Sequence, residues 1–382
     1  MISIATSVTM HTYRFLLTAC CLILLVLSTS ACGDGDYRPR ARGPEGEIVV
    51  VVDDDLWQGP LGSTIRETVG ASIYTLPVPE PSFNIEHVTF TSTDDLEYVQ
   101  KKKNVVIIAQ LADTTSNESK YLYSRLDANA RELVLNGQSA VIQRENLWLK
   151  DQMVVYVVGA TPDALDAVLW ERVEDLQYVF NQKTRTRLAE DMFRKGRQFE
   201  LEDFLLESHD FAVNAQHDYF IAIDTTNFVW MRRVIDSNSW RSFFVYYEDG
   251  ANPNDLTPEW IYSVRDSLTK KYIQGEVAGA VEIAYNRPIV TENVNFLDRY
   301  GFETRGLWHM AIHQDGKIIP IGGGGPFLTY AFYDEDTGRN YLIDGMIFAP
   351  NYPKREFLRQ VEVIAHTFRT GSEATATPTA TD

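Results

Sequence analysis

The stretch FLTYAFYDEDTGRNYLIDGMIF, residues 327–348, decides the fold. Its two apolar runs, 327–334 and 341–348, flank a polar segment, a pattern that predicts a β-hairpin. Because strands joined by short turns pair antiparallel, we expect these runs to belong to one mainly antiparallel sheet. Further strand-like runs of the same half of the chain lie at 219–223, 228–235, 242–248, 277–285 and 304–312.

Two predicted helices accompany this sheet. The first begins at Thr257-Pro258, an N-cap residue followed by the residue favoured at the first helical position. The second covers 354–368 and repeats apolar residues three or four positions apart on one face. Helices that pack on antiparallel hairpins indicate an α+β domain, which we place at residues 211–370.

The other half of the chain predicts a second α+β domain, at residues 47–182. Strand-like runs from Glu47–Val52 onward alternate with helix candidates, and a strong helix begins at Thr161-Pro162. We expect a mainly antiparallel sheet packed by helices here as well. Residues 183–210 are charged and predict a helical connector, and 371–382, GSEATATPTATD, predict a disordered tail.

Residues 1–31 predict an export signal. The apolar run Phe15–Leu27 is shorter than the ~20 residues that a bilayer-spanning helix needs, and small residues follow it. We expect cleavage after Ala31, which makes Cys32 the first residue of the mature chain. Translation starts either at the first residue or at Met10, where a compact signal would begin.

The sequence STSAC, residues 28–32, resembles the lipobox of bacterial lipoproteins. The resemblance implies that Cys32 is acylated and holds the protein on a membrane. Residues 32–46 are rich in glycine, proline and charge and predict a flexible lipidated tether. All 3 cysteines precede Gly33, so the mature chain would have neither an internal disulfide nor a cysteine-ligated metal. We expect a location in the cell envelope, on the periplasmic or the outer face of the outer membrane.

The charge of the chain argues against one class of partner. Asp and Glu outnumber Lys and Arg by 53 to 35, and the net charge is −18. A field of this sign repels phosphate backbones, so we expect no nucleic acid as a partner.

Five short motifs, taken in order, resemble motifs of a known family. They are EIVVVVDDDLWQG at 47–59, RENLW at 144–148, NFVWMRR at 227–233, RGLW at 305–308, and the segment from Ala349-Pro350 to Gln360. They resemble a lipoprotein family of Bacteroidota known as domain of unknown function 4837, over roughly Glu47 to Arg369. The resemblance implies a location in the cell envelope but no activity. The C-terminal half also resembles the PsbP-like α/β sandwich, which is mostly found in binding and assembly factors.

No combination of residues predicts an enzyme. Asp53–Asp55 are adjacent and fit a solvated turn better than a calcium site, and Gly322–Gly325 lead into a strand, not a phosphate-binding helix. Ser208–Asp210 contain the residue types of a catalytic triad, but sequence neighbours point in different directions. His309 and His313 would lie about 13 Å apart along a strand, too far to share a metal. We therefore expect no catalytic residue, no metal and no cofactor.

One cluster could bind a ligand. Trp230 and Arg232 share one face of a predicted strand, and Arg305 and Trp308 lie on another strand. Together they could form an aromatic and arginine surface for a glycan, a peptide or a carboxylate. We favour the other interpretation, in which the tryptophans fill the core and the arginines cover the edge of the sheet.

These observations support a non-enzymatic, lipid-anchored binding or assembly factor as the expected function. Its partners would be the membrane, through the N-terminal lipid, and an envelope protein or a glycan. The alternative is a surface or periplasmic hydrolase, or a glycan-binding protein, with an unrecognised site.

Overall fold

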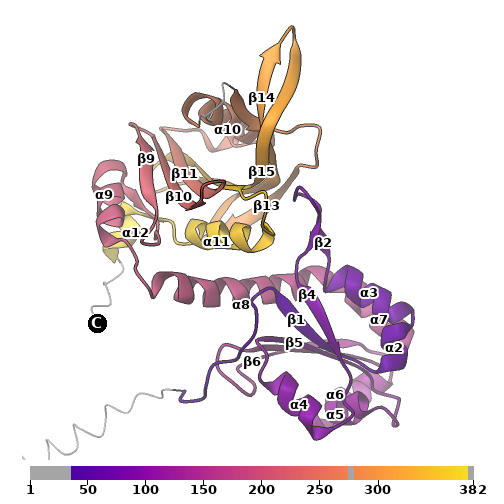
Figure 1. Cartoon of the computed structure of the whole chain (residues 1–382). Coiled ribbons are helices and arrows are strands. Elements are labelled where there is room, and N and C mark those ends of the chain that lie inside the picture. Colours follow the sequence, from indigo (N-terminus) through magenta and orange to yellow (C-terminus); the bar gives the residue numbers. More distant parts are fainter. Residues whose placement is uncertain (1–35, 274–278, 377–382) are drawn as a thin grey trace, which may run out of the picture.

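The structure is a computed structural model that describes residues 36–273 and 279–376 (Figure 1). The predicted signal, its cleavage site at Ala31 and the acylated Cys32 lie outside the described residues. Among the helices of the described residues, none combines the length and the apolarity needed to cross a bilayer.

The N-terminal domain is built on a five-stranded sheet with strand order β4-β1-β5-β7-β6. β4, β1, β5 and β7 are parallel to one another, and only β6 is antiparallel to its neighbour. The predicted antiparallel sheet is therefore wrong for this domain. The cause lies in runs such as VVIIA and VVYVV, which are typical of parallel strands buried on both faces. The strands are β1 Glu47–Val51, β4 Asn84–Val88, β5 Asn104–Gln110, β6 Ala140–Glu145 and β7 Met153–Gly159.

Helices cover both faces of this sheet. α2 (Asp54–Gln58), α3 (Pro60–Thr68) and α7 (Pro162–Glu171) pack on one face, and the other face carries three more helices. The predicted start of α7 is confirmed, because the hydroxyl of Thr161 accepts a hydrogen bond from the backbone of Ala164. The helices of the second face are α4 Thr93–Gln100, α5 Asn117–Arg125 and α6 Ala128–Leu135.

The C-terminal domain contains an antiparallel sheet of eight strands, as predicted. The strand order is β12-β14-β15-β16-β11-β10-β9, and β13 also pairs with β14. The predicted hairpin of residues 327–348 forms β15 and β16. The strands are β9 Phe220–Asp224, β10 Phe228–Asp236, β11 Ser239–Asp249, β12 Ala280–Ile283, β13 Val290–Phe296, β14 Arg299–Gln314, β15 Lys317–Asp334 and β16 Arg339–Phe348.

One helix lies on each face of this sheet, so the domain is an α/β sandwich. α10 (Pro258–Tyr272) packs on one apolar face, and α11 (Arg355–Ala365) packs on the other. Gly345 allows α11 to approach the sheet closely, because a Cβ atom there would lie 2.6 Å from a methyl carbon of Val361. The antiparallel α+β arrangement is confirmed for this domain, and both domains combine helices with sheets.

A long helix lies between the two domains (Figure 1). α8 (Val173–Phe193) continues from α7 and packs against α11, and α9 (Phe199–His209) follows it. Short strands complete the fold. They are β2 Ser72–Ile73 with β3 Glu80–Pro81, and β8 Phe211–Ala212 with β17 Arg369–Thr370.

Residues 38–46 are not a flexible tether. The backbone N–H of Arg42 donates to the carbonyl of Lys101 at 2.7 Å, and Glu45 forms an ion pair of 2.8 Å with Arg187 of α8. Arg187 is only 1% exposed, so this end of the predicted connector is also part of the core. The composition of residues 38–46 predicted flexibility. Their hydrogen bonds and ion pairs to segments that are distant in the sequence hold them in place.

The predicted disorder of the tail is wrong for its first residues, which form α12 (Gly371–Ala376). Glu373 accepts a hydrogen bond from the backbone of Thr370 at 2.9 Å and forms an ion pair of 2.7 Å with Arg299. Polar contacts to the folded domain, including the hydrogen bond from the backbone N–H of Gly371 to the carbonyl of Asp210 at 3.0 Å, therefore hold a segment that has no apolar periodicity. Residues 377–382 lie outside the described part of the chain.

Candidate functional site

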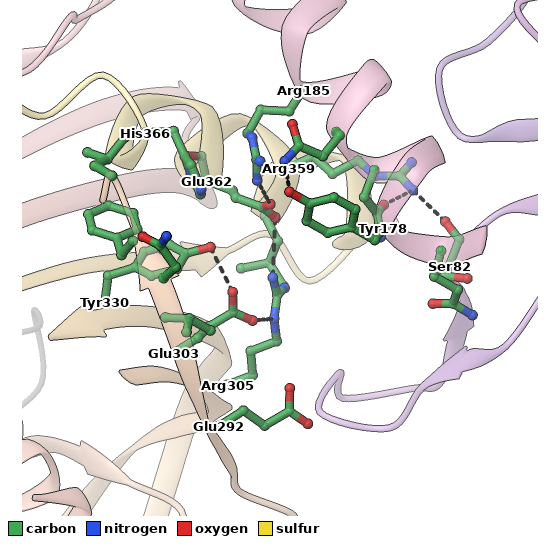
Figure 2. Close-up of a pocket in the computed structure, with 18 of the residues that line it drawn as sticks. Ser82, Tyr178, Arg185, Glu292, Glu303, Arg305, Tyr330, Arg359, Glu362 and His366 are labelled. Atoms are coloured by element: carbon green, nitrogen blue, oxygen red, sulfur yellow. Dashed lines mark hydrogen bonds and ion pairs between the residues drawn. The ribbon is translucent and has the colours of Figure 1, made fainter. Parts of the chain in front are cut away.

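A cavity of about 770 Å³, lined by charged, polar and apolar side chains, lies where the two domains face each other. α8 and the segment around β2 and β3 form the N-terminal side of its wall, and β13, β14, β15 and α11 form the C-terminal side. Figure 2 shows that the charged side chains of both sides point toward one another.

Local periodicity directs these side chains into the cavity. Glu303 and Arg305 are two residues apart on β14, so both point to the face of the sheet that α11 covers. Tyr330 lies on the same face of the adjacent strand β15. Glu362 and His366 are four residues apart at the end of α11 and therefore lie on one side of it.

The central feature of the cavity is a chain of charged contacts that runs from α8 to β15 (Figure 2). Arg185 donates to Oε1 of Glu362 at 3.0 Å, and Arg305 donates to Oε2 of the same carboxylate at 3.3 Å. Arg305 also pairs with Glu303, and the hydroxyl of Tyr330 donates to Glu303 at 2.8 Å. Each carboxylate is therefore held by two donors, in a fixed arrangement.

The surroundings of Glu362, Tyr330 and His366 keep each side chain in one protonation state at neutral pH. Burial raises the pKa of Glu362, but the charges of Arg305 and Arg185 outweigh burial, and the net shift is downward. Burial and the nearby carboxylate of Glu303 raise the pKa of Tyr330 well above its ordinary value. Burial, together with the charge of Arg185, lowers the pKa of His366 and favours the neutral imidazole.

A second group of contacts joins the domains beside the cavity. The carboxylate of Glu80 accepts hydrogen bonds from the backbone N–H groups of Lys354 and Arg355, at 2.7 and 3.1 Å, and so caps the N-terminus of α11. The guanidinium groups of Arg355 and Arg359 donate to the carbonyls of Pro81 and Ser82, each at 2.6 Å. Both walls of the cavity are thereby attached to each other.

Comparison with known proteins matches the two sides of the cavity to two different families. Residues 198–367 match the family described as Domain of unknown function (DUF4837). The matched residues make up most of the C-terminal domain, which is called the DUF4837 domain below. Residues 41–193 match a second family, Domain of unknown function (DUF8532). The resemblance expected from Glu47 to Arg369 is thus confirmed for the DUF4837 domain, and the N-terminal part matches a separate family.

Two solved structures are similar to part of the chain. The Ran-binding protein Mog1p of Saccharomyces cerevisiae is 10% identical, with a TM-score of 0.30, and the match covers 42% of this chain and 90% of that one. A point mutant of protein Mog1 is 9% identical, with a TM-score of 0.30, over 44% of this chain and 94% of that one. No curated protein matches the chain.

The structure separates Arg305 from the other three residues of the predicted aromatic and arginine surface. Trp230 and Trp308 are 6% and 2% exposed and belong to the core beneath α10, as the favoured interpretation expects. Arg232 lies beside them, 5.3 Å from the ring centre of Trp230. Arg305 points to the opposite face of the DUF4837 sheet, into the cavity, because it is an odd number of residues from Trp308 on the same strand.

Sequence reasoning missed most of the cavity. Arg305, Arg355 and Arg359 lie inside the motifs that carry the family resemblance. The arginines of these motifs could have indicated the cavity. Arg185 and Glu362 were not singled out. Nothing in the local sequence indicates that α8 and α11 meet, because their contact joins residues 177 positions apart.

His309 and His313, which we expected to lie too far apart to share a metal, both approach one carboxylate. Both imidazoles reach the carboxylate of Glu282 on the neighbouring strand, at 3.4 and 2.8 Å, and Lys270 pairs with the same carboxylate at 2.9 Å. β14 has a register irregularity directly after His309, which changes the spacing that a regular strand would impose. In the described part of the chain, no group of three or more His, Cys, Asp or Glu residues is arranged to hold a metal ion.

Ser208–Asp210 do not form a triad. The imidazole of His209 is bound instead to residues distant in the sequence, at 2.8 Å from the carboxylate of Asp224 and 3.2 Å from the hydroxyl of Tyr247. His209 is buried, so this arrangement fits a structural role.

Proposed function

We propose that this protein is a lipid-anchored, non-enzymatic binding protein of the cell envelope and that its ligand binds in the cavity between the two domains. The observation that carries the proposal is the chain of charged contacts from Arg185 through Glu362 and Arg305 to Glu303, which lines a cavity of about 770 Å³. A cavity of this size with fixed polar groups is typical of a small-ligand site.

The electrostatics of the cavity favour binding over catalysis. A general acid or base works best with a pKa near the operating pH. The pKa values of Glu362 and His366 are both shifted downward, and that of Tyr330 is shifted upward, away from neutrality in each case. These groups can offer fixed hydrogen bonds to a ligand, but they are poorly matched to proton transfer.

The proposed anchor rests on the sequence around Cys32. Among the described residues, Arg38 is the first whose side chain is tied to the folded body, through the carbonyl of Leu147 at 3.5 Å. A chain extends by at most ~3.6 Å per residue, so the body would be held within about 20 Å of the point where the lipid is attached. The ordered segment that follows Arg38 would keep the N-terminal domain close to the bilayer.

A bulky side chain in the cavity tests the ligand site. Asn181 of α8 lines the cavity, whereas Thr186 of the same helix is exposed and does not. We expect full-length protein purified from its native envelopes to retain a small ligand, detected by native mass spectrometry. Asn181→Trp should abolish retention, and Thr186→Trp should leave it unchanged. Equal retention by Asn181→Trp, or conversion of the ligand to a product, would contradict the proposal.

Replacement of the acylated residue tests the anchor. We expect the wild-type protein to incorporate labelled palmitate and to sediment with the envelopes. Cys32→Ser should lose both the label and the processed N-terminus. Sedimentation of processed Cys32→Ser protein with the envelopes would show that the lipid is not the anchor.

A further inference from the structure

The charges that line the cavity indicate which class of ligand fits it. Four arginines and four carboxylates line the wall, so the numbers of positive and negative groups are equal. They are Arg185, Arg305, Arg355 and Arg359, with Glu292, Asp298, Glu303 and Glu362. His366 adds no charge, since burial favours its neutral form.

Each of the four arginines already has a partner within the protein. Arg185 and Arg305 share Glu362, and Arg305 also pairs with Glu303. Arg355 and Arg359 pair with Glu356 at 2.8 and 2.9 Å. The positive charge of each arginine is therefore already balanced within the protein, and the wall offers an anionic ligand no unpaired positive charge. This argues against phosphate, carboxylate or uronate as the recognised group.

Binding capacity remains although the four arginines are paired. A guanidinium has five N–H groups and a carboxylate can accept about four hydrogen bonds, so the ion pairs leave donors and acceptors unused. The amide side chains of Gln177, Asn181 and Asn295 add a donor and an acceptor each. Hydroxyl groups both donate and accept, and their hydrogen bonds to charged groups are stronger than those between neutral groups. A hydroxyl-rich molecule matches this wall.

An aromatic ring completes the site. Tyr178 on α8 lines the cavity and is 62% exposed, so the surface of its ring is accessible to a ligand. Apolar side chains, including Val294 and Leu358, lie among the polar ones. Sugar rings have hydroxyl groups at their edges and C–H groups on their faces, so one molecule can use the polar groups and the ring surface together.

We infer that the ligand of this cavity is an uncharged oligosaccharide. The inference rests on the proposed function of the cavity and specifies its ligand. The paired arginines disfavour an anion, and the charged wall disfavours an apolar molecule. The mixture of donors and acceptors, together with an exposed tyrosine, fits a neutral sugar.

The test uses the full-length protein and a panel of short, fluorescently labelled neutral oligosaccharides, the matching uronate-containing oligosaccharides, and short peptides. We expect binding only by members of the neutral set. Tyr178→Ala should weaken it at least about tenfold, which corresponds to the energy of a lost aromatic contact. Tyr178→Phe should retain it. Tyr123→Ala is the matched control, since Tyr123 is also exposed but lies on α5, away from the cavity.

The outcomes separate the two proposals. If uronate sugars or peptides bind instead and Asn181→Trp abolishes their binding, the ligand class is wrong and the cavity function stands. If neutral oligosaccharides bind equally well to Asn181→Trp and Tyr178→Ala, the inference is overturned because the site lies elsewhere. If none of the panel binds while the native ligand is still retained by wild type and lost from Asn181→Trp, the ligand class alone is again wrong.

Discussion

Arg265 and Asp344 form an ion pair that is fully shielded from solvent inside the DUF4837 domain. The Nε and Oδ2 atoms are 2.8 Å apart, and the hydroxyl of Thr329 donates to the same oxygen at 2.5 Å. The guanidinium also lies 3.7 Å from the ring centre of Phe327. Burial raises the pKa of Asp344 and Arg265 opposes this shift, so the carboxylate depends on its partner to remain charged.

Loss of one member of this pair should be costly. We expect Asp344→Ala to lower the free energy of unfolding by about 3–5 kcal/mol, because it leaves a buried arginine without a counter-charge. The double variant Arg265→Met with Asp344→Leu should recover most of that loss. Urea unfolding followed by circular dichroism measures both. A loss below about 1 kcal/mol for Asp344→Ala would mean that water replaces the lost carboxylate.

At the scale of elements, β12, β14 and α10 meet at Glu282. This carboxylate is buried, and His313, His309 and Lys270 approach it from β14 and α10. Burial raises the pKa of Glu282, but the hydrogen bonds and charges of Lys270 and His313 outweigh burial, and the pKa lies below its ordinary value of 4.5. The cluster therefore ties the long β14 strand to the helix on its face.

The sign of this shift predicts a pH dependence. A carboxylate whose pKa is lower in the folded than in the unfolded state stabilises the fold above the unfolded value, and this contribution is lost as the pH falls through the folded value. We expect the stability difference between wild type and Glu282→Gln to be largest near pH 6 and to shrink below about pH 4.5. Thermal unfolding across this range measures it, and a difference that grows on acidification would contradict the assignment.

At the scale of the whole molecule, polar contacts join the two domains. Glu80 of the DUF8532 part caps α11 of the DUF4837 domain, and Arg355 and Arg359 donate back to the segment around β3. Arg185 of α8 adds the ion pair with Glu362. Because these contacts line the cavity, the relative placement of the domains and the shape of the site depend on the same side chains.

Removal of the interdomain cap should separate the unfolding of the domains. We expect Glu80→Ala to cost about 1–2 kcal/mol, the usual range for a helix cap. Calorimetry should then show two transitions in place of one. Glu67→Ala is the control, because Glu67 is exposed on α3, away from the interface. A single transition at an unchanged temperature for Glu80→Ala would show that the cap does not couple the domains.

Local chemistry allowed the sequence to determine much of the fold. The helix starts at Thr161-Pro162 and Thr257-Pro258 and the hairpin of residues 327–348 follow from capping, proline geometry and turns between neighbouring residues. The antiparallel sheet of the DUF4837 domain follows for the same reason, because its strands pair mainly with sequence neighbours.

Only the tertiary structure decided the rest. The parallel order β4-β1-β5-β7 joins strands across intervening helices, and the cavity joins Arg185 to Glu362 across 177 positions. Contacts of this kind depend on which distant segments pack together, and a periodic pattern specifies only which face of an element is buried, not what covers it. The sequence by itself therefore determined which segments form helices and which form strands. Packing between distant segments decided which residues form the site.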